Sequence, residues 1–327
     1  MKRWQRFITE RVYSMACHFL SIADYSTEAL SDLLDRSARL KRLYRDGGRD
    51  ACLTGKTVVL LFEKPSSRTR ISFQVAINQL GGGAIYVRPE DIGGLGRREP
   101  IRDLARVLNG YVDVIVARTF SHESVVELAN YSTVPVINAL TDLAHPCQAM
   151  ADMLTMREHF DTLAGRKLAF IGDGNNMAVS LARACVRLGV HFAIASPAGY
   201  ALPAELIDAL QSEDRSQVAA TTDPFEAIAG ADVIYTDTWI SMGEEDDKER
   251  RMRDFADYQV NRRLMDAAPA HAKVMHCLPA YRGKEITDEV IESPPSIVFD
   301  QAENRLHFQR ALLKYLVCHQ APTVPKG

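Results

Sequence analysis

The sequence predicts two α/β domains, each built on a doubly wound parallel sheet, with the active site in the cleft between them. The first observation is length, because 327 residues correspond to about two domains of roughly 150 residues each. The second is that short β-branched segments alternate with amphipathic helical segments from Thr57 onward. The third is that the first of these short segments, Thr57–Phe62 (TVVLLF), is apolar throughout, which is typical of a strand covered on both faces.

The first domain is expected to begin with a strand at residues 57–62 and a helix from about Ser66. Phe73, Ile77 and Leu80 recur at helical spacing, and a run of three glycines at 81–83 ends this helix. The remaining elements of this domain are strands at 84–87, 112–117 and 134–138, a charged loop at 88–99, a helix with Pro100 as its first residue, and a helix after Ser121.

The second domain follows a longer helix at about 146–160, which begins at Pro146 and joins the two domains. Its predicted elements are a strand at 167–171, a helix at 176–188, strands at 191–195, 232–236, 273–276 and 297–299, and a final helix at about 302–319. The domain boundaries are then 1–16 for an N-terminal extension, 17–145 plus the helix 302–320 for the first domain, and 146–300 for the second.

Composition and charge exclude several classes of protein. Hydrophobic residues make up 46% and charged residues 25%, the usual mixture of a globular protein. A net charge of -3 gives no general attraction to nucleic acid or anionic membrane, and no apolar segment is long enough to span a bilayer. The six cysteines are scattered without a CxxC pair, and residues 1–16 lack the apolar core of a secretory signal, so we expect a cytoplasmic location.

Polar residues follow the predicted strands, at the sheet edge where α/β proteins bind ligands. The strongest signal is SSRTR at residues 66–70, where hydroxyls and free backbone N–H groups at a helix start form an anion site. The planar guanidinium of Arg68 suits phosphate. An ordinary serine cap with solvated arginines is the alternative, but five such residues after a buried strand favour phosphate.

Other side chains at the same edge extend this cleft. Arg118 follows the strand at 112–117, and His145 and Gln148 flank the start of the helix at Pro146. Gly172-x-Gly174 is similar to a dinucleotide fingerprint, but Met177 occupies the third glycine position and no ribose-binding acid follows the next strand. NAD is therefore excluded, and an asparagine pair at this turn can bind a carboxylate or an amine instead.

Six motifs in fixed order carry a family resemblance: FEKPSSRTR, HPCQ, FIGDGNN, DTWISMG, HCLPA and FDQAENRLH. They closely resemble the ornithine carbamoyltransferases, of the aspartate/ornithine carbamoyltransferase family, over roughly residues 17 to 320. SxRTR and HPxQ are shared by both branches and specify carbamoyl phosphate, whereas DxWxSMG and HCLP indicate ornithine. The resemblance implies transfer of the carbamoyl group of carbamoyl phosphate to the δ-amino group of L-ornithine, giving L-citrulline and phosphate in arginine metabolism.

The resemblance also implies the site residues, with no metal or organic cofactor. Carbamoyl phosphate would be bound by Ser66, Ser67, Arg68, Thr69, Arg118, His145, Gln148, Cys277, Leu278 and Arg305. Ornithine would be bound by Asn176, Asp237, Ser241 and Met242. The catalytic residues implied are Arg68, Arg118, His145 and Cys277: the arginines offset phosphate charge and His145 donates to the carbamoyl oxygen.

The sequence offers two candidates for the group that accepts the proton of the attacking amine. The δ-ammonium group of ornithine must lose a proton before it attacks, since its pKa lies near roughly 10 by analogy with lysine. A Cys277 thiolate and the departing phosphate are both candidates.

One position departs from the family pattern. The family commonly has a glutamine, which reaches the phosphate of a neighbouring subunit, where this chain has Gly94. Either Arg97 or Arg98 replaces it, or phosphate binding is weakened. The resemblance implies a homotrimer or a multiple of trimers.

Three competing functions are each disfavoured by a particular feature of the sequence. A carbamoyltransferase for N-acylornithine or putrescine needs only small pocket changes, although the intact SMG motif favours free ornithine. A non-catalytic binding paralogue is suggested by Gly94 but disfavoured by the other side chains. A nucleotide-dependent oxidoreductase on the same fold is disfavoured by the incomplete fingerprint.

Overall fold

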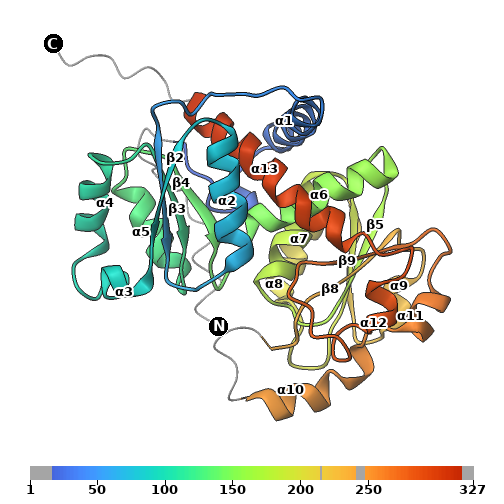
Figure 1. The fold of residues 1–327 in the computed structure, drawn as a ribbon. Coiled ribbons are helices and arrows are strands. Elements are labelled where there is room, and N and C mark those ends of the chain that lie inside the picture. The colour runs from blue at the N-terminus through green and yellow to red at the C-terminus, as the bar shows by residue number, and fades with distance from the viewer. Residues whose placement is uncertain (1–16, 214–215, 241–246, 319–327) are drawn as a thin grey trace.

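The computed structural model describes residues 17–213, 216–240 and 247–318 and contains two parallel sheets (Figure 1). The strand order is β2-β1-β3-β4 in the first sheet and β7-β6-β5-β8-β9 in the second. Helices cover both faces of each sheet, so the predicted class of two doubly wound α/β domains is confirmed. Within the described ranges, no helix is both long and apolar enough to cross a bilayer.

The first sheet consists of β1 (Thr57–Phe62), β2 (Gly83–Val87), β3 (Val114–Arg118) and β4 (Val136–Leu140). β3 and β4 each begin two residues later than predicted. The Val112 N–H donates to the Leu108 carbonyl (3.0 Å), so Val112 still belongs to the turn that ends the preceding helix. The Val134 carbonyl accepts from the Ser132 hydroxyl (2.7 Å), and Pro135 has no N–H for the ladder.

The position of β1 in the middle of the sheet, with helices on both faces, explains why its sequence is apolar throughout. Val58, Leu60 and Phe62 pack on one side with helices α1, α2 and α13, whereas Val59 and Leu61 pack on the other side with α4 and α5. The helices of this half are α1 (Thr27–Arg45), α2 (Ser67–Gln79), α3 (Pro89–Ile92), α4 (Ile101–Asn109) and α5 (His122–Asn130).

Two local predictions in this half are wrong. The loop predicted at 88–99 contains the short helix α3, because the Asp91 carboxylate accepts from the backbone N–H of Arg88 (2.9 Å) and caps it. Pro100 is the N-cap of α4 rather than its first residue, since its ψ of 141° is extended.

The second sheet consists of β5 (Lys167–Ile171), β6 (His191–Ala195), β7 (Val218–Thr221), β8 (Val233–Thr236) and β9 (Lys273–His276). Its helices are α7 (Asn176–Arg187), α8 (Ala204–Gln211), α9 (Pro224–Ile228), α10 (Lys248–Asp254), α11 (Arg262–Ala267) and α12 (Asp288–Ile291). The edge strand β7 was not predicted. The strand predicted at 297–299 is wrong. The backbone N–H of Ile297 donates to the Val274 carbonyl, but the Ile297 carbonyl already accepts from the Gln301 N–H, which is the first hydrogen bond of a helix.

Two long helices join the halves (Figure 1). α6 (Pro146–Phe160) has the predicted bounds and is buried along most of its length. α13 (Val298–Cys318) starts beside β9 and packs against α1, α2 and α6 of the first half. The carboxyl ends of β1 and β3 therefore face those of β5, β8 and β9 across one cleft.

Candidate active site

The phosphate end of the cleft is the N-terminus of α2. Ser66 is its N-cap, and its Oγ accepts from the Thr69 N–H (3.4 Å) and donates to the Thr69 hydroxyl (3.1 Å). Because the first N–H groups of a helix have no partners within the helix, this end attracts an anion. Lys64 lies in the same wall, with its ammonium 4.5 Å from the centre of the Phe120 ring.

Three arginines converge on this end. Arg305 donates to two neutral groups, the Gln148 Oε1 and the Thr69 hydroxyl (2.8 Å). Burial, followed by the charges of Arg305 and Arg68, lowers the pKa of Arg118 to about 9. Within the described part of the chain, the Nε atoms of Arg118 and Arg305 are buried without a hydrogen-bond partner. The cluster is therefore poorly compensated, and a multiply charged anion would relieve it.

His145 stands at the N-cap of α6, between the two halves. Its backbone N–H donates to the Ser180 hydroxyl of α7 (2.8 Å). Burial, and then the charges of Arg305 and Arg118, push the pKa of its imidazole well below the usual range. The ring is therefore neutral at neutral pH and can donate one hydrogen bond without adding a positive charge.

Behind Gln148 lies a residue that sequence reasoning missed, Asp152. Its Oδ1 accepts from Gln148 Nε2 (2.7 Å) and Gln301 Nε2 (2.8 Å), and its Oδ2 accepts from the Tyr235 hydroxyl (3.0 Å). Burial raises the pKa of Asp152 to about 7, although the three hydrogen bonds act in the opposite direction. Since Asp152 can accept where Arg305 can only donate, it fixes the orientation of the Gln148 amide.

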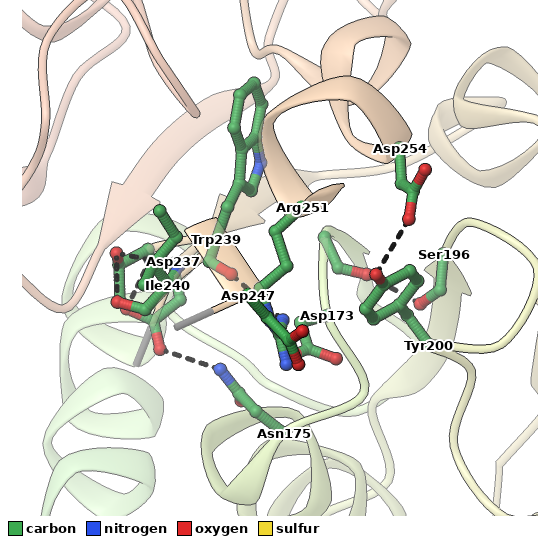
Figure 2. Close-up of polar contacts among 12 residues, drawn as sticks. Asp173, Asn175, Ser196, Tyr200, Asp237, Trp239, Ile240, Asp247, Arg251 and Asp254 are labelled. Carbon is green, nitrogen blue, oxygen red and sulfur yellow. Dashed lines mark hydrogen bonds and ion pairs between the residues drawn. The ribbon is translucent and has the colours of Figure 1, made fainter. Parts of the chain in front are cut away.

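The opposite wall is built on the turn after β5 and the end of β8. Asn175 Nδ2 donates to Asp237 Oδ2 (3.1 Å), as Figure 2 shows. The Thr238 N–H donates to Asp237 Oδ1 (2.7 Å). Asn176 Nδ2 donates across the cleft to the Thr141 carbonyl (2.5 Å). This turn needs Gly174 for close approach, because a Cβ there would lie 2.6 Å from the backbone nitrogen of Leu202.

Asp173 of the same turn also binds α10, which comes after β8 in the sequence. Arg251 of α10 donates to the Asp173 carboxylate (2.8 Å) and to the Trp239 carbonyl (3.0 Å), as Figure 2 shows. The predicted ornithine ligands Ser241 and Met242 lie outside the described residues.

The loop after β9 closes the cleft with Cys277 and Leu278. The thiol of Cys277 donates to Asp237 Oδ1 at 2.9 Å. Burial, and then the charge of Asp237, raise the pKa of this thiol well above its usual range. Cys277 is therefore a neutral thiol at neutral pH, which weakens the hypothesis that it is a thiolate base.

These walls enclose a cleft of about 350 Å³. The predicted site residues that line it are Ser66, Ser67, Arg68, Thr69, Arg118, His145, Asn176, Asp237, Cys277, Leu278 and Arg305. Gln148 does not line the cleft and supports Arg305 from behind. Residues that line it without having been assigned a role are Lys64, Pro65, Leu140, Met177, Thr238, Ile240, Pro279 and Tyr281. Most directly follow a strand or adjoin an assigned residue, so the same strand-end signal could have found them.

The cleft therefore combines an anion site with a neutral hydrogen-bond donor, His145, and a carboxylate fixed by hydrogen bonds, Asp237. The cations can bind a phosphate ester, the neutral His145 can donate to a carbonyl oxygen, and Asp237 can accept from an ammonium group. Such a cleft can bring an amine to a carbonyl carbon activated by phosphate.

Comparison with known proteins agrees with this chemistry. The carbamoyl-P binding domain model of the aspartate/ornithine carbamoyltransferases matches residues 17–158, and the Asp/Orn binding domain model matches residues 164–316. The chain is 50% identical to an ornithine carbamoyltransferase of Anoxybacillus flavithermus over 303 residues, which cover 91% of this chain and 96% of that protein. The solved ornithine carbamoyltransferase from Pyrococcus furiosus has a TM-score of 0.88 and 45% identity, covering 93% of this chain and 97% of its own. Both halves of the cleft are matched, and the chain belongs to the aspartate/ornithine carbamoyltransferase family.

Proposed function

We propose that this protein is an ornithine carbamoyltransferase, which converts carbamoyl phosphate and L-ornithine into L-citrulline and phosphate in arginine biosynthesis. The observation that carries the proposal is the poorly compensated cluster of Arg68, Arg118 and Arg305 facing Asp237 across one cleft. The names of the relatives and the two matching domains support ornithine as the acceptor.

In this proposal, the N-terminus of α2 and the arginine cluster bind carbamoyl phosphate. Ser66, Ser67, Arg68 and Thr69 hold the phosphate with Arg118 and Arg305, which lie within the same lining. His145, neutral because of burial, donates to the carbamoyl oxygen as negative charge develops on it. Gln148 contributes by fixing Arg305, and Cys277 and Leu278 border the carbamoyl group.

Ornithine enters against the second half. Asp237 accepts from its α-ammonium group, and Asn176, Ser241 and Met242 complete the recognition of the α-amino and α-carboxylate groups. The neutral δ-amine then attacks the carbamoyl carbon, the new C–N bond forms, and the bond to the phosphate oxygen breaks. Positioning both substrates in one cleft supplies much of the acceleration.

The departing phosphate is the better candidate for the proton acceptor. A thiolate at Cys277 is opposed by burial and by the adjacent Asp237 carboxylate, which both raise the pKa of the thiol. The phosphate oxygen lies next to the attacking amine in any productive arrangement and gains negative charge as the bond breaks. The ammonium group releases its first proton to solvent before attack, and the second proton, which becomes acidic once the C–N bond has formed, passes to this phosphate oxygen. The reaction then balances without a base from the protein.

We further propose a cytoplasmic homotrimer, or a multiple of trimers, whose sites are shared between subunits. The cysteines among the described residues are all free thiols, which suits a reducing compartment. Residues 17–145 with helix 302–320 would form the carbamoyl-phosphate-binding domain, and 146–300 the ornithine-binding domain. Gly94 has a φ of 87°, which disfavours the family's glutamine there, so Arg97 or Arg98 would reach the neighbouring site.

A citrulline assay tests the proposal, with ornithine, N-acetylornithine, putrescine and aspartate each offered separately with carbamoyl phosphate. Ornithine is expected to be the only efficient acceptor. Preference for N-acetylornithine or putrescine would reassign the acceptor. Carbamoyl phosphate binding without any product would instead indicate a binding paralogue.

A further inference from the structure

The loop that closes the cleft after β9 has an unusual backbone at Leu278. Its φ is 58°, in the left-handed region that residues with a Cβ rarely adopt. Leu278 also lines the cleft, so its backbone conformation fixes how its peptide groups are presented to that cleft. Such a conformation persists only where the surrounding structure holds it in place.

The neighbouring His276 supplies one such contact. Its side chain is buried, and its Nδ1 lies 2.8 Å from the backbone nitrogen of Leu278. A backbone N–H can only donate, so Nδ1 must be the acceptor and carries no proton. In a neutral imidazole the proton is then on Nε2, and a doubly protonated ring cannot make this contact.

Glu285 stabilises this placement of the proton from the other side of the ring, because it accepts a hydrogen bond from Nε2–H. Its Oε1 lies 3.2 Å from His276 Nε2 and also accepts from the Tyr281 N–H (2.5 Å). The Glu285 side chain is fully buried, and neither contact is part of the chemistry proposed above. One carboxylate oxygen thus fixes the imidazole tautomer and also ties down the far end of the loop.

The other side of the loop is anchored as well. The backbone N–H of His276 donates to Gln301 Oε1 (2.9 Å), and Gln301 also binds Asp152 (2.8 Å) behind the anion site. Gln301 lies one turn before Arg305 on α13. The anchored loop is therefore connected to the element that carries a phosphate-binding cation.

We propose that Glu285, acting through the Nε2–H tautomer of His276, is a positioning residue that holds Leu278 in its left-handed conformation at the carbamoyl site. This inference rests on the proposed function, because turnover is one of its readouts. The Glu285 carboxylate touches no substrate in this proposal, and its effect is transmitted through one imidazole ring.

A pair of variants isolates the Oε1 acceptor. In Glu285→Gln the amide oxygen can accept from both His276 and Tyr281, whereas in Glu285→Met no acceptor remains. In Glu285→Met the buried donors of His276 and Tyr281 lose their acceptor, which destabilises the conformation of the loop, so kcat should fall about 10- to 100-fold. In Glu285→Gln the acceptor is kept, so kcat should stay within about 3-fold of wild type. Affinity for carbamoyl phosphate, measured by calorimetry without ornithine, should change less than about 3-fold, since the arginine cluster is intact.

Val290→Ala is the matched control. It removes packing from the buried cluster of the same half and leaves Glu285 in place, so it should lower the unfolding midpoint and leave kcat unchanged. Equal kcat in Glu285→Met and Glu285→Gln would overturn the proposal. Equal losses of kcat and carbamoyl phosphate affinity in Glu285→Met would also overturn it, because they indicate general damage.

A second measurement does not depend on a variant that folds. In wild-type protein labelled with 15N-histidine, magic-angle-spinning NMR should show His276 with a protonated Nε2 and an unprotonated Nδ1 at neutral pH. The opposite tautomer, or a doubly protonated ring, would overturn the proposal. If the wild type formed no citrulline, the proposed function would fail, while the tautomer could still be read.

Discussion

Arg68 and Arg70 occupy neighbouring positions of one motif but have different surroundings. Arg68 lines the cleft, where its charge lowers the pKa of Arg118. Arg70 is exposed, with its guanidinium 3.9 Å from the centre of the Tyr86 ring. The SSRTR sequence predicts an anion site but cannot distinguish these two side chains.

This contrast gives a matched pair of variants. Arg68→Ala should weaken carbamoyl phosphate binding about 100-fold, because a charge-assisted contact to phosphate is lost in a partly buried site. Arg70→Ala should leave the affinity nearly unchanged. Calorimetric titration measures both, with circular dichroism to confirm folding, and equal affinities in the two variants would contradict the assignment of Arg68.

Cys277 provides a test of the proton acceptor. Since burial and Asp237 raise the pKa of its thiol, the group stays protonated throughout the neutral range. Cys277→Ser preserves a donor to Asp237, so turnover should fall less than about 10-fold and the acidic limb of the pH–rate profile should not move. Removing a true general base would cost roughly 10²–10⁴-fold and shift that limb, which would restore the thiolate hypothesis.

At the level of elements, the sequence predicts best where one strong local signal dominates. The bounds of β1, β5 and α6 match the prediction, since each strand has a run of buried apolar residues and Pro146 starts the helix. β7 was missed because VAAT is a short edge strand with two exposed positions. The residues at 297–299 are apolar and β-prone, which favours a strand. The chain instead turns into α13 there, and this places the Gln301 side chain where it accepts from the backbone N–H of His276.

Asp152 joins three elements that lie far apart in the sequence, and no motif of the sequence indicates this. It binds Gln148 of its own helix α6, Tyr235 of β8 and Gln301 of α13. The HPCQ motif predicts Gln148 as a ligand, and in the described structure Asp152 and Arg305 hold its amide. Which residues support a site through such long-range contacts depends on how the whole fold packs, so a local motif does not reveal them.

The raised pKa of Asp152 predicts a pH dependence of stability. In the unfolded chain this carboxyl ionises near 3.8, whereas in the folded protein its pKa is about 7. Between these values the folded state retains a proton that the unfolded state has lost, so the contribution of Asp152 to stability is full below pH 3.8 and is lost as pH rises through about 7.

Asp152→Asn removes this titration. The unfolding free energy of the variant minus that of wild type should increase by about 3 kcal/mol between pH 4 and pH 7, since each pKa unit corresponds to about 1.4 kcal/mol and both groups are only partly titrated at the ends of this range. Urea unfolding at fixed protein concentration measures it, with Asp35→Asn at an exposed site as the control. A difference that does not vary with pH would show that Asp152 titrates alike in both states.

At the scale of the whole molecule, the proposed trimer with shared sites makes a prediction about the loop around Gly94. Leu95 N–H donates to Glu63 Oε1 (3.1 Å), which anchors this loop at the end of β1. Arg97 and Arg98 are exposed and do not line the cleft of their own subunit in the described structure. If they replace the family's glutamine, they must act on the phosphate of a neighbouring subunit.

Co-expression of two inactive chains tests this arrangement. One chain carries Arg68→Ala, which disables its own phosphate site, and the other carries Arg97→Ala and Arg98→Ala, which disable the contribution to a neighbour. In mixed trimers from equal amounts, about a quarter of the sites would combine an intact cleft with an intact neighbouring loop, so citrulline formation should recover to about a quarter of wild type. Mixtures no more active than the separate chains, or full activity of the double variant alone, would place phosphate binding within a single subunit and leave Gly94 without a functional substitute.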